Sequence, residues 1–379
     1  MSTHWLSKLT VIFLALLATS WAQSNTPAAA VALEQKGDLP QAAQAWRSFI
    51  AAHPRDAGAY ASLGVVLAKQ QKYPEAVAAY KKALSLDPRL PGIEMNLGLA
   101  EFKQGHFHAA IAPLKAAAAR EPGNFQAHTL LGLSYYGDKQ YANAIESLKV
   151  AMHVDPANVE LQQIVAQSCL WAGQYQCALD GFRQILMTQP NSAAAHVLIG
   201  EALDGLGKTP EAIAEFQQAA QVSPHEPNVH FGLGFLYWKS QDYEKAKAEF
   251  QAELSNDGDN AQAWAYLGDT ETKLGNRDRA ASDLNKAIQL RSDIRLAYID
   301  RGIMLSEDNK HKDAIADFRK AIELDPGQPD AHYRLARAYQ ALGESTEAEK
   351  EFKRVQQLRQ ELDTRLTPKM SSAPPALQP

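Results

Sequence analysis

Positive charge and enzyme motifs are both scarce in this sequence of 379 residues. Lys and Arg total 38 against 43 Asp and Glu, so the formal net charge is -5. Nucleic acids and anionic membranes attract proteins with basic surfaces. The charge balance therefore gives no reason to expect DNA, RNA or an anionic membrane as a partner.

Several motifs that mark common enzymes are missing. There is no His-Glu-x-x-His, no Cys-x-x-Cys and no Gly-x-Ser-x-Gly. Residues 202–209 fit a loose form of a phosphate-binding loop, but they join two predicted helices, whereas a true phosphate loop follows a strand. We therefore expect that the protein is not an enzyme and that it binds no cofactor and no metal.

The first 22 residues differ from the rest of the chain. They contain a single Lys, Arg, Asp or Glu, which is Lys8, followed by an apolar run at residues 9–18 that is too short to span a bilayer. Ser20 and Ala22 are small residues at the positions that signal peptidase inspects. We interpret residues 1–22 as a signal peptide cleaved after Ala22, with an uncleaved anchor as the alternative. The mature protein is then expected to be periplasmic or extracellular and to have no integral membrane segment.

Cysteine occurs only twice, as Cys169 and Cys177. Disulfides persist in exported proteins, so this pair could form one bridge. The alternative is two small buried thiols. The sequence leaves both interpretations open.

A period of 34 residues runs through the chain without insertion or deletion from Gln23 to about residue 362. Position twenty of every repeat is Ala, and position eight is always Gly or Ala. Ten repeats begin at residues 23, 57, 91, 125, 159, 193, 227, 261, 295 and 329.

Each repeat is predicted to form two helices joined by a short turn. In residues 57–90, apolar side chains recur at helical spacing first around Leu63 and again around Tyr80. The small residues at positions eight and twenty allow the two backbones to approach closely, while the large residue at position twenty-four fills the space beside them. A bulkier residue at a small position would overpack this contact at about 1 to 3 kcal/mol.

Four histidines fall on position four of their repeats, where other repeats carry Tyr60, Trp264 or Tyr298. Because an aromatic ring occupies that position elsewhere, we expect these histidines to be packing rings rather than metal ligands. They are His128, His196, His230 and His332.

The period and the residue pattern resemble the tetratricopeptide repeat (TPR) family, with the Leu63-Gly64 pair and the ring at position four among the matching features. The resemblance implies an all-α fold, a right-handed superhelical solenoid of ten 34-residue helix-turn-helix repeats at residues 23–362. The last helix is expected to act as a solvated cap, and residues 363–379 to form a disordered tail.

In the TPR family, positions 2, 5, 9, 12 and 13 of each first helix point into a concave groove. Carried onto this chain, these positions give an apolar, aromatic-rich set that we expect to bind a partner. The alternative is that the superhelix closes tightly enough to bury some of them. The set comprises Met95, Leu99, Phe102, Leu133, Tyr136, Trp171, Phe231, Phe235 and Trp238.

The resemblance therefore favours a non-catalytic scaffold in the cell envelope that holds another protein or a peptide segment in its groove. The alternative is a regulatory or substrate-recruiting subunit of an envelope enzyme or export complex, such as a glycosyltransferase. A tail of 17 residues outside the repeats is too short to build an active site, which favours the scaffold. The sequence leaves the partner's identity and the oligomeric state open.

Overall fold

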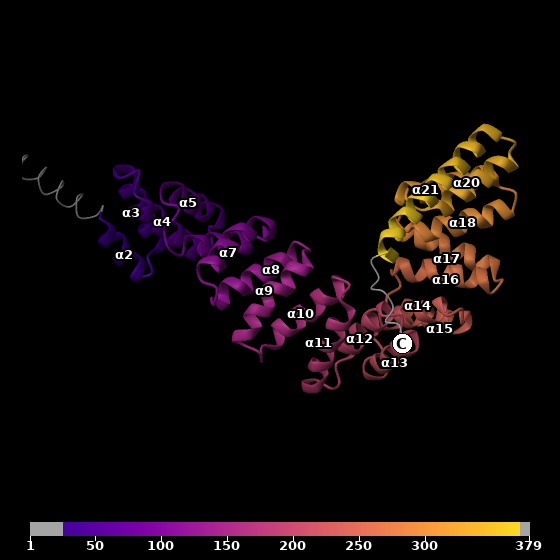
Figure 1. Cartoon of the computed structure of the whole chain (residues 1–379), viewed down its shortest axis with the longest axis horizontal. Helices are drawn as coiled ribbons and strands as arrows, with labels where there is room; N and C mark the ends of the chain where they lie inside the picture. Colours follow the sequence, from indigo (N-terminus) through magenta and orange to yellow (C-terminus); the bar gives the residue numbers. More distant parts are fainter. Residues whose placement is uncertain (1–25, 372–379) are drawn as a thin grey trace, which may run out of the picture. The chain divides into compact units, whose positions relative to one another are not determined.

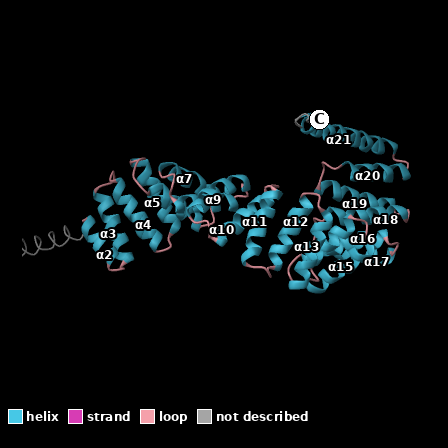
Figure 2. Ribbon diagram, turned by 60° about the horizontal axis from the view of Figure 1, so that its bottom comes forward, coloured by secondary structure: helices cyan, strands magenta, loops and turns pink. Residues whose placement is uncertain are grey.

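The computed structural model describes residues 26–371, and every regular element in that range is a helix (Figures 1 and 2). The predicted signal peptide and residues 372–379 of the predicted tail lie outside the described residues. The chain divides into two compact blocks. The first ends at Ile185 and the second begins at Leu186, and they are called the N-terminal and C-terminal blocks below.

The N-terminal block stacks antiparallel helices in chain order (Figure 1). Its helices are α2 (Pro27–Gln35), α3 (Leu39–Ala52), α4 (Ala57–Lys69), α5 (Tyr73–Leu86), α6 (Ile93–Lys103), α7 (Phe107–Arg120), α8 (Phe125–Gly137), α9 (Tyr141–Val154), α10 (Val159–Trp171) and most of α11 (Tyr175–Thr188).

The C-terminal block is built in the same way. Its helices are α12 (Ala193–Gly205), α13 (Thr209–Val222), α14 (Val229–Lys239), α15 (Tyr243–Asn256), α16 (Ala261–Lys273), α17 (Arg277–Leu290), α18 (Arg295–Glu307), α19 (His311–Leu324), α20 (Pro329–Ala341) and α21 (Ser345–Ser371). Residues 26–371 thus contain twenty helices, two for each of ten repeats, which confirms the predicted all-α repeat fold.

The turn inside each repeat is fixed by one left-handed residue. Position fifteen has a φ between 60° and 80° in all ten repeats, and every second helix begins two residues later. Glycine adopts this conformation without steric cost, and six repeats use it. The ten residues are Gly37, Gln71, Gly105, Lys139, Gly173, Gly207, Gln241, Gly275, Asn309 and Gly343.

Most first helices begin at position one, after a residue such as Asp56 or Asn124 whose side chain accepts a hydrogen bond from the first turn. Helices α6 and α14 begin two residues later. Their preceding residues, Gly92 and Asn228, have φ values of 75° and 64° and make no side-chain cap. Because Gly and Asn are the residues that adopt this left-handed conformation most readily, the chain turns there before the helix starts.

The small residues make the predicted close helix contact. The alanine at position twenty is at most 2% exposed in all ten repeats. A Cβ built on Gly64 would lie 2.4 Å from the ring of Tyr80, and one on Gly132 would lie 2.5 Å from Leu148. The residue at position twenty-four therefore occupies the space that a larger residue at position eight would need.

The last helix departs from the sequence expectation. Helix α21 continues to Ser371, so residues 363–371, which were expected to belong to the disordered tail, are helical. No glycine or proline occurs between Ser345 and Thr367, so nothing in the sequence ends the helix near residue 362.

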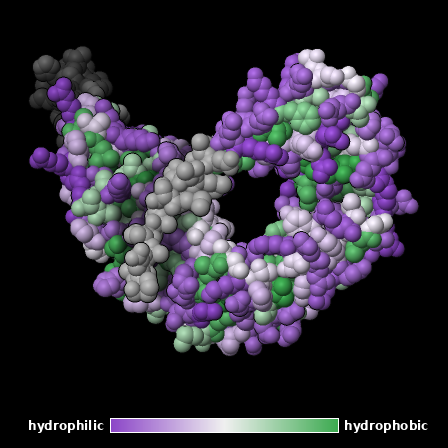
Figure 3. Space-filling model, turned by 45° about the vertical axis from the view of Figure 1, so that its right-hand side comes forward, coloured by the Kyte–Doolittle hydropathy of each residue, from purple (hydrophilic) through white to green (hydrophobic). Residues whose placement is uncertain are grey.

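The visible face in Figure 3 is mostly hydrophilic, with hydrophobic side chains showing as smaller patches among the helices. Within residues 26–371, no helix is both long enough and apolar enough to cross a lipid bilayer.

Candidate functional site

Six of the nine predicted partner-binding residues lie on the two shortened helices, α6 and α14. The start of α14 is held by a buried glutamate of α15, Glu253. Glu253 is 4% exposed, and its Oε2 accepts a hydrogen bond from the backbone N–H of Phe231 at 3.1 Å. Asn260 donates to the other carboxylate oxygen at 3.1 Å. Glu253 therefore supplies the cap that Asn228 does not, and it fixes where Phe231 and the following turn lie.

The rings of α14 pack with a tyrosine from the next repeat, and we call Phe231, Phe235, Trp238 and Tyr266 the α14 cluster. The ring centroids of Phe235 and Trp238 are 5.9 Å apart with an interplanar angle of 24°. Tyr266 meets both rings edge-on, at 5.6 Å from Phe235 and 5.2 Å from Trp238. Such stacked and edge-to-face pairs hold the rings in a fixed arrangement.

The polar edge of the cluster is also fixed. The indole Nε1 of Trp238 donates to Oδ2 of Asp269 at 2.5 Å, and Asp269 is 4% exposed. Lys273 lies 3.6 Å from the same carboxylate. Burial and the nearby carboxylates of Asp269 and Asp300 raise the pKa of Tyr266 above its ordinary value. The four rings of the cluster are partly buried, so each keeps some accessible surface in a preset orientation.

A pocket of about 310 Å³ lies beside this cluster, among α12, α13 and α14. Rings form one side of the pocket and two carboxylates lie on α12. Its lining residues are Glu201, Asp204, Phe216, Asn228, Phe231, Gly232, Phe235 and Leu236. A Cβ on Gly232 would lie 2.2 Å from the ring of Phe216, so glycine is required there for the two helices to approach.

The two carboxylates of the pocket differ in their environment. Asp204 accepts a hydrogen bond from Nζ of Lys239 at 2.7 Å. For Glu201 the residues 26–371 show no hydrogen bond or ion pair, and loss of water around the carboxyl group raises its pKa above the ordinary value. The pocket is therefore lined by one carboxylate that has a cationic partner, Asp204, and one that has none within the described residues, Glu201.

A second group of rings lies in the N-terminal block, and we call Tyr136, Tyr141 and Trp171 the α8 cluster. Tyr136 stacks on Trp171 with centroids 5.3 Å apart and an interplanar angle of 25°. Tyr141 lies 5.0 Å from Trp171 and 6.0 Å from Tyr136. The hydroxyl of Tyr136 donates to the amide oxygen of Gln167 at 2.8 Å. Trp171 is 47% exposed and is therefore the most accessible of the nine predicted residues.

The other predicted residues of the N-terminal block, Met95, Leu99, Phe102 and Leu133, are all partly buried. Phe102 contacts Phe107 edge-on at 5.6 Å. None of the nine predicted residues is fully buried, although the sequence alone left that possibility open. In residues 26–371, the aromatic residues among the nine make ring contacts only within their own block.

Two ring residues of these clusters were not predicted from the sequence. Tyr266 is at position six, outside the groove positions that the family resemblance supplies. Tyr141 is at position seventeen, the first residue of the second helix, which is also aromatic in Tyr73, Phe107 and Tyr175. That recurrence could have been read from the sequence, whereas the single Tyr266 carries no comparable signal.

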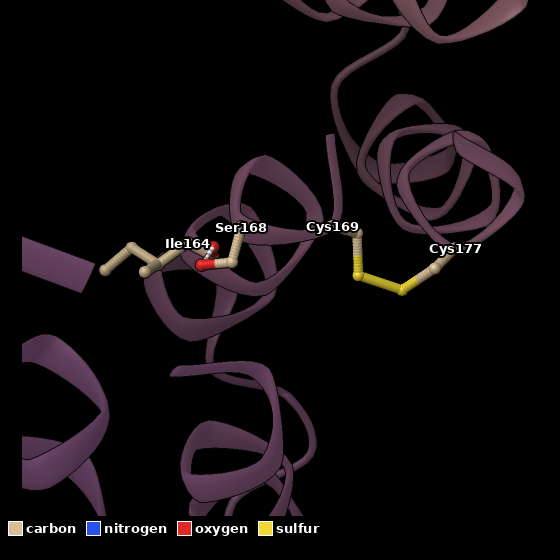
Figure 4. The surroundings of a disulfide bond; sticks show 4 residues. All are labelled: Ile164, Ser168, Cys169 and Cys177. Atoms are coloured by element: carbon tan, nitrogen blue, oxygen red, sulfur yellow. Dashed lines mark hydrogen bonds between the residues drawn. A yellow bond between two sulfur atoms is a disulfide. The ribbon is translucent and has the colours of Figure 1, made fainter. Parts of the chain in front are cut away.

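The two cysteines are joined by a disulfide that links α10 to α11 (Figure 4). Their Cα atoms are 5.7 Å apart, within the range that a disulfide bridges. Cys169 is fully buried. The adjacent Ser168 turns the other way and donates to the carbonyl of Ile164 at 2.7 Å.

The histidines at position four do more than pack. Three of them hydrogen-bond through Nδ1 to a glutamate at position twenty-three of the same repeat. The pairs are His196 with Glu215, His230 with Glu249, and His332 with Glu351, at 2.6 to 2.7 Å. Residues 26–371 contain no group of three or more His, Cys, Asp or Glu side chains that could hold a metal ion.

Family models described as Tetratricopeptide repeat match most of the chain. One model matches residues 20–91, 95–158 and 170–227, a second matches 205–269 and 305–366, and a third matches 261–294. The chain belongs to the tetratricopeptide repeat family. The TPR repeats are thus established by both the sequence models and the helix pattern.

Similarity to individual proteins is more limited. The human DnaJ homolog subfamily C member 3 is 31% identical over 83 residues, which is 22% of this chain and 16% of that protein. The chain thus matches about a sixth of the length of that relative.

Two solved structures are similar to parts of the TPR chain. A crystal structure of MamA is 23% identical, with a TM-score of 0.39, over 44% of this chain and 97% of that one. YrrB, described as a TPR protein with an unusual peptide-binding site, is 21% identical, with a TM-score of 0.39, over 50% of this chain and 97% of that one.

Proposed function

We propose that this TPR protein is a non-catalytic scaffold that binds a partner protein, or an extended segment of one, on the face formed by its first helices. TPR repeats are typically interaction modules without catalytic groups. The observation that carries the proposal is the α14 cluster, whose rings are partly accessible and held by Glu253 and Asp269. Aromatic anchors of this kind dominate the energetics of many protein interfaces.

The preset geometry of the α14 cluster supports binding over simple packing. A side chain that is ordered before binding loses less conformational freedom when the partner arrives. Here the Trp238 indole is already hydrogen-bonded to a buried carboxylate, and Tyr266 already braces two rings. A partner that contacts these rings therefore binds without paying the full entropic cost of ordering them.

The test is capture of partners by the mature chain from its native envelope fraction, compared with the variant Phe235→Ala/Trp238→Ala. The matched control is Val222→Ala, which removes an exposed apolar side chain from a second helix of the same block. The proposal requires a partner that binds the wild type and the control but is lost from the double variant. A partner retained equally by all three proteins, each of normal helicity, would place the contact elsewhere and contradict the proposal.

We further propose that the protein acts outside the cytoplasm. The apolar run at residues 9–18 and the small residues before Gln23 support export, and the Cys169–Cys177 disulfide suits an oxidising compartment. Amino-terminal sequencing of the native protein should give Gln23 as the first residue, and thiol titration should find no free cysteine. A native protein that begins with Met1, or that carries two free thiols, would contradict this location.

A further inference from the structure

The pocket beside the α14 cluster combines two kinds of wall. Phe231 and Phe235 line it from α14, and Glu201 lines it from α12. A volume of about 310 Å³ is larger than a few water molecules need, so the pocket can receive a side chain.

The unbalanced charge in this pocket belongs to Glu201. Asp204, one turn further along α12, is matched by Lys239 from α14. Glu201 is exposed as a residue, lines the pocket beside Phe231 and Phe235, and has no such partner within residues 26–371; partial loss of water raises its pKa above the ordinary value. An apolar side chain entering the pocket would remove still more water from Glu201 without replacing it, which is unfavourable for a carboxylate.

We infer that this pocket receives a basic side chain, Arg or Lys, of the partner segment. The cationic group lies against Glu201, and the aliphatic stem packs on Phe231 and Phe235. A basic side chain suits both walls, because its stem covers apolar surface while its head group is charged, and cations are attracted to ring faces.

This inference rests on the proposed binding function, which supplies the partner segment. It adds a selection rule to that function, since an acidic or apolar residue at the same position of the partner would leave Glu201 uncompensated. Because the ion pair forms in a partly enclosed pocket, it selects among partners more than it draws them from a distance.

A peptide library tests the inference while the partner is still unidentified. A display library of random twelve-residue peptides is selected against the mature chain, and peptides that fail to bind Phe235→Ala/Trp238→Ala are retained. These cluster-dependent peptides should share an Arg or Lys at one aligned position. Glu201→Gln should bind them at least tenfold more weakly, and Glu201→Lys should select peptides with Asp or Glu at that position instead.

The matched control is Glu211→Gln, which removes an exposed acid from α13 in the same block. It should bind the selected peptides within twofold of the wild type. Replacing the shared basic residue of a peptide by Gln should weaken its binding to the wild type tenfold but should have little further effect on Glu201→Gln, because directly paired groups are not additive.

The possible outcomes distinguish the pocket inference from the scaffold function. The basic-pocket inference is overturned if the cluster-dependent peptides share no basic residue. It is also overturned if Glu201→Gln and Glu211→Gln lose the same affinity for these peptides. Either result leaves the scaffold function standing. A library that yields no cluster-dependent peptide overturns the peptide-binding form of the proposed function, and the pocket inference with it. Normal helicity of all variants by circular dichroism excludes misfolding as the cause.

Discussion

The α8 cluster and the α14 cluster each contain a ring at position twelve of a repeat, Tyr136 and Trp238, but the two rings differ in what surrounds them. In the α8 cluster the polar partner is a neutral amide, Gln167, and Trp171 is nearly half exposed. In the α14 cluster the polar partner is the buried carboxylate of Asp269, and Tyr266 from the next repeat braces the rings. The same repeat position thus carries a ring with a neutral partner in one block and a ring with a charged, buried partner in the other.

The largest expected effect follows from that difference. Phe235→Ala/Trp238→Ala should weaken partner binding by about 2 kcal/mol or more, roughly thirtyfold. Tyr136→Ala/Trp171→Ala should weaken it less, because the α8 rings are held less firmly before binding and lose more conformational freedom when a partner arrives. Titration calorimetry with the captured partner measures both. An equal or larger loss from the α8 pair would show that rigidity does not rank the two clusters.

A larger residue at position twenty should lower the stability of the helices around it without affecting the other cluster. Ala144 and Ala246 are both fully buried at position twenty of their repeats. Replacing either by Leu should cost about 1 to 3 kcal/mol locally. Since repeats are stabilised mainly by their neighbours, Ala144→Leu should speed hydrogen exchange around α8 and α9, and Ala246→Leu around α14 and α15. Uniform acceleration over both blocks in either variant would contradict this locality.

A pH effect is expected from Asp300, which lies close to Asp269 at the polar edge of the α14 cluster. Burial, together with the Asp269 carboxylate and despite Lys273 and Arg334, raises the pKa of Asp300 to about 8. In the unfolded chain this pKa is about 3.9. Between these values the folded state retains a proton that the unfolded state has lost, so the free energy of unfolding falls as pH rises.

The variant Asp300→Asn removes this titration. Relative to the variant, the wild type should lose stability from pH 5 to pH 8, by on the order of 1 kcal/mol in urea unfolding. The control Asp313→Asn changes an exposed acid of α19 and should follow the wild type. Parallel pH curves for the wild type and Asp300→Asn would mean that Asp300 is ionised across this range in the folded state.

Salt should have the smallest effect. Ring burial is not screened by ions, and a partly enclosed pair is screened less than an exposed one. Raising sodium chloride from 0.1 to 0.5 M should therefore change partner affinity by less than about threefold. Release of the partner by moderate salt, together with normal binding by Phe235→Ala/Trp238→Ala, would assign the contact to a charged face.

The fold could be predicted because its causes are local and repeated. Ala at position twenty and Gly or Ala at position eight recur in every repeat, and the close contact that they allow, as between Gly132 and Leu148, is the one observed. The late start of α14 was harder to foresee, because it depends on Asn228 taking a left-handed conformation, which Asn permits but does not require.

The candidate site was only partly predictable. The resemblance to the TPR family picked out Phe235 and Trp238 as first-helix residues, and both are partly accessible. It could not show that Tyr266 would reach them, since that contact depends on the packing of one repeat on the next. In the sequence Glu253 stands out only as large for its position, and its hydrogen bond to Phe231 depends on the late start of α14.

The α14 cluster spans the boundary between two repeats, and this has an evolutionary consequence. Each repeat has a left-handed residue at position fifteen and begins its second helix at position seventeen, so whole 34-residue blocks could be duplicated or deleted while the helical register is kept. The α14 cluster does not follow those boundaries, because Trp238 belongs to one repeat and Tyr266 and Asp269 belong to the next. A gene rearrangement that separated these two repeats would keep the helical repeats but would break up the α14 cluster, on which the proposed partner binding depends.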